Sequence, residues 1–486
     1  MLPDDFTTLP DLVRGHARAR GAAVAVIDGP LRMDWATLDR RSDRVAAALQ
    51  RDGCGKGDVI AIAATMQADY LVVWLGALRA GLAVAPLPQS VTAEALAGMV
   101  ADAGAAMLFD DAALAGIEAW LAPDGSAVAP VAISPDDPFN LIYSSGTTGR
   151  PKGIVQPHSQ RWAHVQRGLA QGYGPDAVTL VATPLYSNTT LVSVIPTLGL
   201  GGTLVLLPKF DAAAFLQLSA AHRVSHVMLV PVQYRRLLEM PDFDHFDLSA
   251  YRAKFCTSAP FPAALKAEVL RRWSGGLTEY YGMTEGGGTC ILRCHERPDK
   301  LATVGQPAAG SDMRLIDAEG RELPAGATGE VVGRSPAMMQ GYHGLPEATR
   351  AAEWFSPDGA RFIRTGDIGR FDDEGFLTLV DRAKDLVISG GFNIYPSDLE
   401  GVLASHPDVV EAAVVAVPSA RWGETPVAFV VARAGADLAA IRGWANDRLG
   451  RTQRIADIAL VASLPRSEIG KVLKRELRDA YRGEVP

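Results

Sequence analysis

Residues 143–153 read YSSGTTGRPKG and combine residue types that suit a phosphate group. Glycines allow tight turns and a close approach of the backbone to a ligand. Hydroxyl groups can donate hydrogen bonds to phosphate oxygens, and Lys152 adds a positive charge. The spacing differs from the GxxxxGK[ST] pattern of a Walker A loop. The segment therefore predicts a phosphate-binding loop of another type, built from Ser144, Ser145, Gly146, Thr147, Thr148, Gly149 and Lys152.

The sequence around this loop alternates between helix-like and strand-like segments. Apolar residues from Leu38 to Leu49 recur at helical spacing, and Gly53 offers a stop to that helix. The run VIAIAA, which begins at Val59, is typical of a buried strand. Such alternation predicts parallel sheets covered by helices. The alternating segments lie at residues 59–64, 70–80, 82–85, 203–207 and 226–230.

After about residue 310 the pattern changes to strand-like runs separated by glycines and acidic turns, at residues 313–316, 329–333 and 375–380. From Asp385 onward a compact α+β unit is expected, with a helix at 397–405 and strands at 412–417 and 426–432. Pro396 suits the start of that helix. We therefore predict an N-terminal domain over residues 1–380, a hinge over 381–385 and a C-terminal domain over 386–486.

Composition excludes several classes of protein. The 486-residue chain has a net charge of −8 and no long basic run, which argues against a nucleic-acid partner. Its four cysteines do not form a disulfide framework and favour a reducing compartment. The N-terminus lacks the apolar core of a signal peptide. Glycines and Pro196 interrupt the uncharged stretch at 191–208, so a buried helix and strand are expected there. We expect a cytoplasmic protein without a membrane span.

The loop at 143–153 resembles the phosphate-binding signature of the adenylate-forming superfamily, which contains acyl- and aryl-CoA synthetases, nonribosomal-peptide adenylation domains and beetle luciferases. Further motifs of that family follow in order: EYYGMTE at 279–285, RTGD at 364–367, DRAKD at 381–385 and PRSEIGK at 465–471. The resemblance implies ATP-dependent conversion of a carboxylic acid to its acyl-adenylate, and then acyl transfer to coenzyme A. It also implies an α/β N-terminal domain of two doubly wound sheets and a small β-barrel, with a small mobile α+β C-terminal domain.

The same resemblance assigns contacts to the adenine and the phosphates. It implies that Tyr281 stacks on the adenine, with Ser258 and Ala259 forming a wall beside it. Thr284 is expected to bind the α-phosphate and Glu285 to hold Mg²⁺. The last role suits the chemistry, because a hard cation prefers carboxylate and phosphate oxygens together.

The later motifs imply a ribose site, a hinge and a catalytic lysine. Asp367 is expected to accept both ribose hydroxyls, since a carboxylate has lone pairs on two oxygens, and Arg382 is expected to help. Lys384 falls at the hinge, about which the C-terminal domain would rotate between the two half-reactions. Lys471 is expected to stabilise the negative charge that develops as the acid attacks the α-phosphorus.

Coenzyme A has its own expected contacts. Gly390 and Gly391 would let the pantetheine arm approach the backbone closely. Trp422 either stacks on the nucleotide of coenzyme A or packs within the protein. The implied ligands are thus ATP, Mg²⁺ and coenzyme A as co-substrate.

The acid is far less constrained by the sequence. Residues 183–190 read TPLYSNTT, with Ser187 where the family commonly has histidine. Tyr186, Ser187, Asn188, Thr189 and Gly286 are candidates for the acid pocket, and glycines at 286–288 suggest room for a bulky or long acid. An aryl or arylpropenoic acid and a medium-to-long-chain fatty acid both remain open. No residue reads as a cationic partner for a second carboxylate.

Several alternatives stay open at this point. A freestanding adenylation enzyme could load a carrier protein, and a luciferase-like oxygenase shares the first half-reaction. A non-catalytic nucleotide-binding relative would be expected to lack at least one of the charged motif residues, yet all are present: Lys152, Glu285, Asp367, Arg382 and Lys471. Cys290, Cys294 and His295 lack a second pair at metal-site spacing, so a structural role is expected. A homodimer is one open alternative for the oligomeric state.

Overall fold

The structure is a computed structural model that describes residues 5–144, 152–324, 326–382, 385–389, 392–419, 422–450, 453–467 and 470–483. Contacts divide the chain into two compact units. Unit 1 consists of residues 1–312 and 333–363, and unit 2 of residues 313–332 and 364–486. The predicted domain boundary at residue 380 and the hinge at 381–385 stay predictions.

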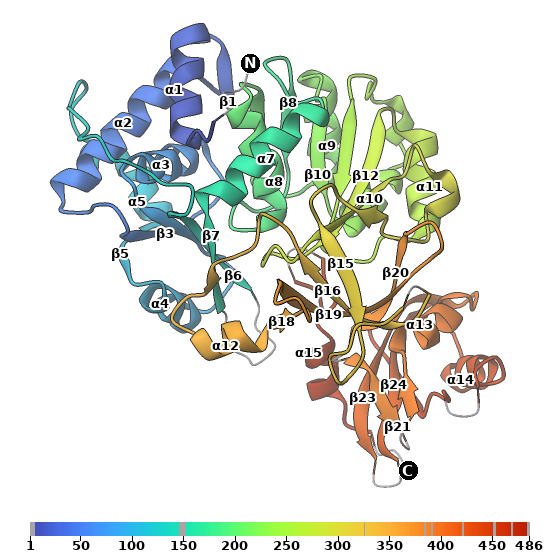
Figure 1. Cartoon of the computed structure of the whole chain (residues 1–486). Helices are drawn as coiled ribbons and strands as arrows, with labels where there is room; N and C mark the ends of the chain where they lie inside the picture. Colours follow the sequence, from blue (N-terminus) through green and yellow to red (C-terminus); the bar gives the residue numbers. More distant parts are fainter. Residues whose placement is uncertain are drawn as a thin grey trace. The chain divides into compact units, whose positions relative to one another are not determined.

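The larger sheet of unit 1, of which Figure 1 labels several strands, has nine strands among the described residues according to its hydrogen-bonded pairings. In spatial order these are β14 (Gln306–Pro307), β13 (Thr289–Arg293), β12 (Gly276–Gly282), β11 (Ala253–Cys256), β10 (His226–Leu229), β8 (Val178–Val181), β9 (Thr203–Leu206), β1 (Val24–Asp28) and β2 (Leu31–Asp34). The six strands from β12 to β1 run parallel, and the outer pairings are antiparallel. A parallel centre needs cover on both faces, and α-helices supply it.

A second sheet of unit 1 carries the predicted phosphate-binding segment. Its described strands are, in spatial order, β17 (Gly341–Tyr342), β7 (Lys152–Pro157), β6 (Pro138–Ser144), β4 (Ala83–Pro86), β3 (Val59–Ala63) and β5 (Ala105–Asp110). Strands β3 and β4 are buried along their whole length, as their unbroken apolar runs predict.

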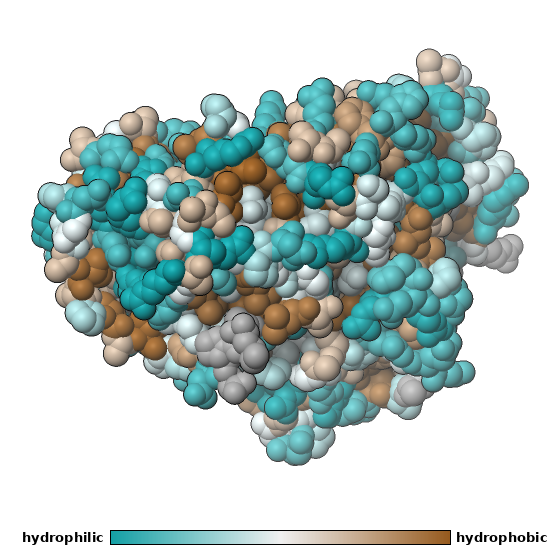
Figure 2. Space-filling view, turned by 90° about the horizontal axis from the view of Figure 1, so that it is seen from above, coloured by the Kyte–Doolittle hydropathy of each residue, from teal (hydrophilic) through white to brown (hydrophobic). Residues whose placement is uncertain are grey.

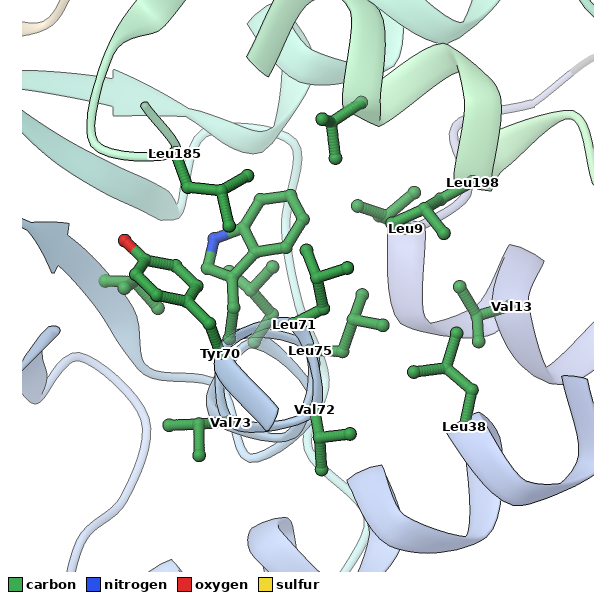
Figure 3. Close-up of a cluster of buried hydrophobic side chains, with 14 of the residues drawn as sticks. Leu9, Val13, Leu38, Tyr70, Leu71, Val72, Val73, Leu75, Leu185 and Leu198 are labelled. Atoms are coloured by element: carbon green, nitrogen blue, oxygen red, sulfur yellow. The ribbon is translucent and has the colours of Figure 1, made fainter. Parts of the chain in front are cut away.

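Helices α1 (Leu9–Arg20), α2 (Trp35–Arg51), α3 (Ala68–Arg79) and α8 (Asn188–Gly199) share one hydrophobic core. Figure 3 looks down α3, whose Leu71, Leu75 and Tyr70 point toward side chains of neighbouring segments, among them Leu9, Leu185 and Leu198. All of these residues are buried. This packing fixes α8, whose N-cap Ser187 and first residue Asn188 are two of the predicted acid-pocket residues.

The remaining described helices of unit 1 are α4 (Ala93–Asp102), α5 (Asp111–Ala115), α6 (Ile117–Trp120), α7 (His158–Ala170), α9 (Ala212–Ala221), α10 (Pro231–Leu238), α11 (Ala263–Arg272) and α12 (Pro346–Ala351). Short 3₁₀ turns occur at Phe243–His245 and Pro298–Lys300.

A third sheet orders β15 (Asp312–Ile316), β16 (Gly329–Arg334), β19 (Arg361–Phe371) and β18 (Glu353–Phe355), and β20 (Leu377–Arg382) pairs with β19. It occupies the part of the chain where the sequence changes to strand-like runs.

The fourth sheet belongs to unit 2 and orders β22 (Phe392–Ile394), β21 (Val387–Ser389), β24 (Gly423–Ala432) and β23 (Val409–Ser419), with β25 (Asp457–Leu460) on β24. Helices α13 (Pro396–Ala404), α14 (Leu438–Asn446) and α15 (Lys474–Ala480) accompany it. Val387, Leu399, Val414 and Val430 are buried in a core of this sheet and its helices. The fold class predicted from the sequence, a large α/β part followed by a small α+β part, is confirmed.

The uncharged stretch at 191–208 forms α8 and β9, as its proline and glycines predict. Among the described residues, no helix is long and apolar enough to cross a membrane. The face drawn in Figure 2 shows hydrophilic and hydrophobic residues intermixed.

Candidate active site

Parallel strands of the nine-stranded sheet bring predicted site residues to one edge. Strands β8, β10, β11 and β12 run parallel as consecutive neighbours, so their carboxyl ends meet at the same edge. Ligands of open α/β sheets bind at such an edge. Tyr186 follows β8, Ser258 and Ala259 follow β11, and Tyr281 lies near the end of β12. The sheet therefore brings the residues predicted to contact adenine to the same edge as Tyr186, the first residue predicted to line the acid pocket.

A direct contact joins these two sets. The hydroxyl groups of Thr189 and Ser258 lie 2.6 Å apart. Ser258 has φ +80°, a left-handed conformation that is uncommon for residues other than glycine. Backbone strain of this kind clusters at functional sites, where the surrounding structure holds it in place. The loop after β11 is thus fastened to the first turn of α8.

Ser187 has a local structural task that explains its residue type. It is the N-cap of α8, and its hydroxyl accepts a hydrogen bond from the backbone N–H of Thr189 over 3.3 Å. Serine is a preferred N-cap residue because it satisfies an otherwise unpaired N–H of the first turn. Ser187 is buried, whereas Tyr186 and Asn188 are partly exposed.

The predicted phosphate-binding loop joins β6 to β7. These strands form an antiparallel hairpin in which Ser144 pairs with Lys152. The predicted ligands Ser145, Gly146, Thr147, Thr148 and Gly149 lie outside the described residues. Lys152 is described, and its Nζ lies 4.9 Å from the centre of the Tyr342 ring. A cation over an aromatic face is attracted by the ring quadrupole, so Tyr342 places the ammonium group.

The same tyrosine holds Glu285. The Tyr342 hydroxyl donates to Glu285 Oε1 over 2.9 Å, and burial raises the pKa of Tyr342 above its usual value, with Glu285 adding to the rise. Glu285 itself is only 9% exposed. It forms no ion pair with any residue in the described part of the chain. Tyr342 belongs to β17, which pairs with β7. The role of Tyr342 was not predicted from the sequence, because nothing in residues 339–343 indicates that pairing.

Mg²⁺ fits this donor set. A buried carboxylate without a cationic partner is costly, and a divalent cation would neutralise it. The described residues contain no group of three or more His, Cys, Asp and Glu side chains that could hold a metal ion alone. A metal at Glu285 would therefore need oxygens from a bound phosphate. Cys290 and Cys294 are buried with raised thiol pKa values and belong to the protein interior.

The first two glycines after Glu285, Gly286 and Gly287, do not open the space that the sequence suggested. A Cβ on Gly286 would lie 2.0 Å from the carbonyl oxygen of Ala337, and one on Gly287 would lie 2.7 Å from Cβ of Ile363. The backbone of 333–339 packs against this turn, and Met339 N–H donates to Glu285 O over 2.8 Å. The expected room at Gly286 and Gly287 is thus filled by protein. The place of Gly286 beside the acid stays a prediction.

We expect Gly286→Ala to destabilise unit 1 strongly. Gly286 has φ +74°, so alanine there adds a left-handed strain of about 1–2 kcal/mol to a clash costing about 1–3 kcal/mol. Gly53→Ala is the matched control, since Gly53 has φ +87° and a methyl group on its Cα would meet no atom of the described residues within 4 Å. Thermal unfolding should show a clearly larger shift for Gly286→Ala; equal shifts would contradict the packing described.

The predicted ribose pair lies in unit 2. Asp367 and Arg382 are directly opposite each other on β19 and β20, and Arg382 Nε lies 2.9 Å from Asp367 Oδ1. The Asp367 side chain is 13% exposed and that of Arg382 is 39% exposed. Gly366 has φ +69°, which supplies the turn before Asp367. The ion pair with Arg382 therefore orients the Asp367 carboxylate on β19.

We expect Asp367→Asn to raise the KM for ATP. A lost hydrogen bond to a charged group is worth about 1.5–3 kcal/mol, which corresponds to roughly 10- to 100-fold. Glu330→Gln is the control, because Glu330 pairs with Arg364 in the same sheet but has no predicted ligand role. Steady-state kinetics with varied ATP checks this; an unchanged KM would remove Asp367 from the ribose site.

Backbone contacts of the described neighbouring residues hold Lys471 in unit 2. Arg466 and Val472 form a β-bridge, Ser467 N–H donates to Lys471 O over 2.9 Å, and the Ser467 hydroxyl accepts from Lys471 N–H over 3.2 Å. Gly470 has φ +76°, as this reversal requires. These contacts hold the Lys471 backbone, and its side chain is partly exposed.

The hinge and coenzyme A candidates complete the predicted set. Trp422 is 46% exposed, which leaves its ring accessible. The hinge residue Lys384 and the coenzyme A candidates Gly390 and Gly391 lie outside the described residues. Asp381, at the start of the predicted hinge, accepts from Ser397 N–H over 2.9 Å, which ties it to the first turn of α13.

Sequence reasoning also missed Arg161. This buried arginine on α7 contacts side chains of β6, β7 and α8. In the sequence it is one charged residue within an amphipathic helix, and no local signal distinguishes it.

Comparison with known proteins identifies the family. The model of the AMP-binding enzyme family matches residues 13–343, and the model of the AMP-binding enzyme C-terminal domain matches residues 398–471. Feruloyl-CoA synthase of an Amycolatopsis species is 34% identical to this chain, with 96% of this chain and 97% of the relative covered.

Two further matches extend the comparison. Fatty acid–[acyl-carrier-protein] ligase ScoC of Streptomyces coeruleorubidus is 30% identical, with 98% of this chain and 97% of the relative covered. The solved structure of o-succinylbenzoate CoA synthetase from Bacillus subtilis, in complex with the acyl-adenylate intermediate, has a TM-score of 0.87 at 26% identity. That match covers 99% of this chain and 100% of the other. The chain therefore belongs to the AMP-binding enzyme family, and it is an adenylate-forming ligase.

Proposed function

We propose that this enzyme activates a carboxylic acid with ATP and passes the acyl group to the thiol of coenzyme A. The observation that carries the proposal is the surroundings of Glu285. This buried carboxylate forms no ion pair within the described residues and accepts a hydrogen bond from the Tyr342 hydroxyl. The ammonium group of Lys152 lies over the ring of the same tyrosine. Such a carboxylate suits a phosphate-bound divalent cation. The family match over most of the chain supports the same function.

In the first half-reaction a carboxylate oxygen of the acid attacks the α-phosphorus of ATP, and the bond from that phosphorus to pyrophosphate breaks. Thr284 would bind the α-phosphate, and Lys152 would lie near the departing phosphates. Lys471 would face the oxygen shared by the acid and the phosphorus, where negative charge develops. Mg²⁺ at Glu285 would neutralise phosphate charge when bound.

In the second half-reaction the thiolate sulfur attacks the acyl carbon, and the bond from that carbon to the AMP oxygen breaks. We propose that rotation about residues 381–385 exchanges Lys471 for the coenzyme A contacts. Few residues are needed to absorb such a rotation. Gly390, Gly391 and Trp422 are the candidates on this chain for holding the pantetheine arm and the nucleotide.

The acid is proposed to be an arylpropenoic acid or a medium-to-long-chain fatty acid. The relative named for feruloyl-CoA synthesis supports the first class, and the relative named for fatty acid ligation supports the second. The second relative is also named for a carrier-protein acceptor, so loading of a carrier protein is the alternative outcome to test.

Pyrophosphate release should be measured with ATP, Mg²⁺ and coenzyme A across aryl, cinnamic and C2–C16 acids, with mass spectrometry of the products. Acid-dependent pyrophosphate together with acyl-CoA supports the proposal and names the acid class. Acyl-adenylate without a coenzyme A ester would favour a carrier-protein acceptor. No acid-dependent pyrophosphate for any acid would contradict the proposed function.

A further inference from the structure

Arg161 lies at the centre of a buried hydrogen-bond network in unit 1. Its Nε and Nη2 donate to Asn140 Oδ1 over 2.9 and 2.8 Å, and Nη2 also donates to Gln156 Oε1. Its Nη1 donates to Asn188 Oδ1 over 2.9 Å and lies 3.4 Å from Nδ1 of His164. All five N–H groups of the guanidinium thus have acceptors.

Within the described residues, this cation is paired with neutral groups alone. Arg161 is 1% exposed and forms no ion pair within the described residues. Burial lowers the pKa of its guanidinium to about 9, which still leaves it charged at neutral pH. Burial also holds the pKa of His164 well below its usual value, so that ring is neutral and can accept. A buried charge without a counter-ion is expensive, and well-packed apolar residues often stabilise a core better.

Two chains of hydrogen bonds, here called the two arms, lead from the guanidinium of Arg161 to residues of the proposed site. Along the first arm, Gln156 accepts from Arg161 and donates through Nε2 to the carbonyl oxygen of Thr284 over 2.7 Å. Asn140 supports this arm by donating to Gln156 Oε1 over 2.8 Å. The Thr284 carbonyl belongs to the peptide that joins Thr284 to Glu285. Fixing that peptide fixes the origin of both side chains.

The second arm ends at Asn188, the first residue of α8. Arg161 donates to the carbonyl oxygen of the Asn188 side-chain amide, so the NH₂ group of that amide can donate to other groups. An N–H donor beside an acid would favour acids with an oxygen acceptor, such as a ring hydroxyl or ether, over plain alkyl acids.

We propose that Arg161 is a positioning residue that sets the Thr284–Glu285 peptide and the Asn188 side chain together, so that the phosphate end and the acid end of the site keep one geometry. The inference rests on the proposed function, since it assumes that these segments face ATP and the acid. A displacement of about 1 Å in such a site can lower the rate roughly 100-fold.

The test compares Arg161→Met and Arg161→Lys with the natural enzyme. We expect Arg161→Met to lower kcat for acid-dependent pyrophosphate release about 100-fold, with a smaller change in the KM for ATP. Lysine keeps the charge but not the five-donor fork, so Arg161→Lys should recover only part of the loss. The kcat/KM ratio of ferulic acid to cinnamic acid, which lacks the ring oxygens, should fall in both variants and in Asn188→Leu.

Arg79→Met is the matched control. Arg79 is also buried, but it pairs with Asp39 and Asp43, and its hydrogen bonds within the described residues go to Pro10, Asp39 and Asp43, away from the proposed site residues. Its loss should lower the melting temperature and leave kcat per folded molecule unchanged. Gln156→Leu tests the first arm: combined with the Arg161 variant it should add little further loss, because residues acting in series are not additive.

Three results would overturn the inference. The first is an unchanged kcat in folded Arg161→Met, or in Arg161→Lys and Gln156→Leu if the methionine variant does not fold. The second is an equal kcat loss in Arg79→Met. The third is a preference of the natural enzyme for dicarboxylic acids that Arg161→Met abolishes, which would make Arg161 a substrate ligand. Absence of acid-dependent pyrophosphate in the natural enzyme would instead refute the proposed function.

Discussion

Lys471→Ala should lose adenylation while keeping thioester formation. We expect pyrophosphate release to fall about 10²–10³-fold, the loss of about 3–4 kcal/mol typical for one preorganised group that meets developing charge. Thioester formation from preformed acyl-adenylate should stay within a few-fold of the natural rate, because no pentavalent phosphorus forms in that step. Single-turnover assays of the two half-reactions, run separately, measure both effects.

A second lysine of the same segment provides the control. Lys474 lies three residues later, and its Nζ pairs with Glu400 Oε1 at 2.8 Å, which gives it a structural role in unit 2. Lys474→Ala should lower stability modestly and change neither half-reaction per folded molecule. Equal loss of both half-reactions in Lys471→Ala would show that this lysine supports the fold and not the adenylation step.

Glu285→Gln is the second substitution with a large expected effect. The amide keeps the shape and can still meet the Tyr342 hydroxyl, but it removes the charge that would attract Mg²⁺. We expect kcat for pyrophosphate release to fall about 10²–10³-fold, and the Mg²⁺ concentration for half-maximal rate to rise. Titration of activity with MgCl₂ at fixed ATP measures both.

The control for Glu285 is another carboxylate of unit 1. Glu353 is 12% exposed and is neutralised by Arg361, whose Nε lies 2.7 Å from its Oε1. Glu353→Gln should reduce stability without moving the Mg²⁺ titration. If Glu285→Gln kept the natural Mg²⁺ requirement and rate, the buried carboxylate would not belong to a metal site.

The parts of the site that the sequence predicted correctly are those encoded by neighbouring residues. The unbroken apolar run after Val59 identifies a buried strand, and β3 is buried along its length. Ordered motifs such as EYYGMTE identify the family, because their spacing along the chain is itself informative.

The parts that could not be predicted depend on long-range packing. Tyr342 reaches Glu285 only because the two-residue strand β17 pairs with β7. The backbone near Ala337 fills the space beside Gly286, and no local pattern indicates which segment does so. Arg161 gains its role from partners on three other elements, so its sequence neighbours on α7 carry no sign of it.

The proposed adenylation chemistry can be tested by following oxygen from the acid into AMP. The best acid of the panel, labelled with ¹⁸O in both carboxylate oxygens, should be incubated with ATP, Mg²⁺, coenzyme A and the enzyme, and the nucleotide products examined by mass spectrometry. Attack of the carboxylate on the α-phosphorus predicts AMP with one ¹⁸O atom and unlabelled pyrophosphate. Formation of ADP with ¹⁸O in inorganic phosphate would contradict the proposal, because it would place the attack on the γ-phosphorus.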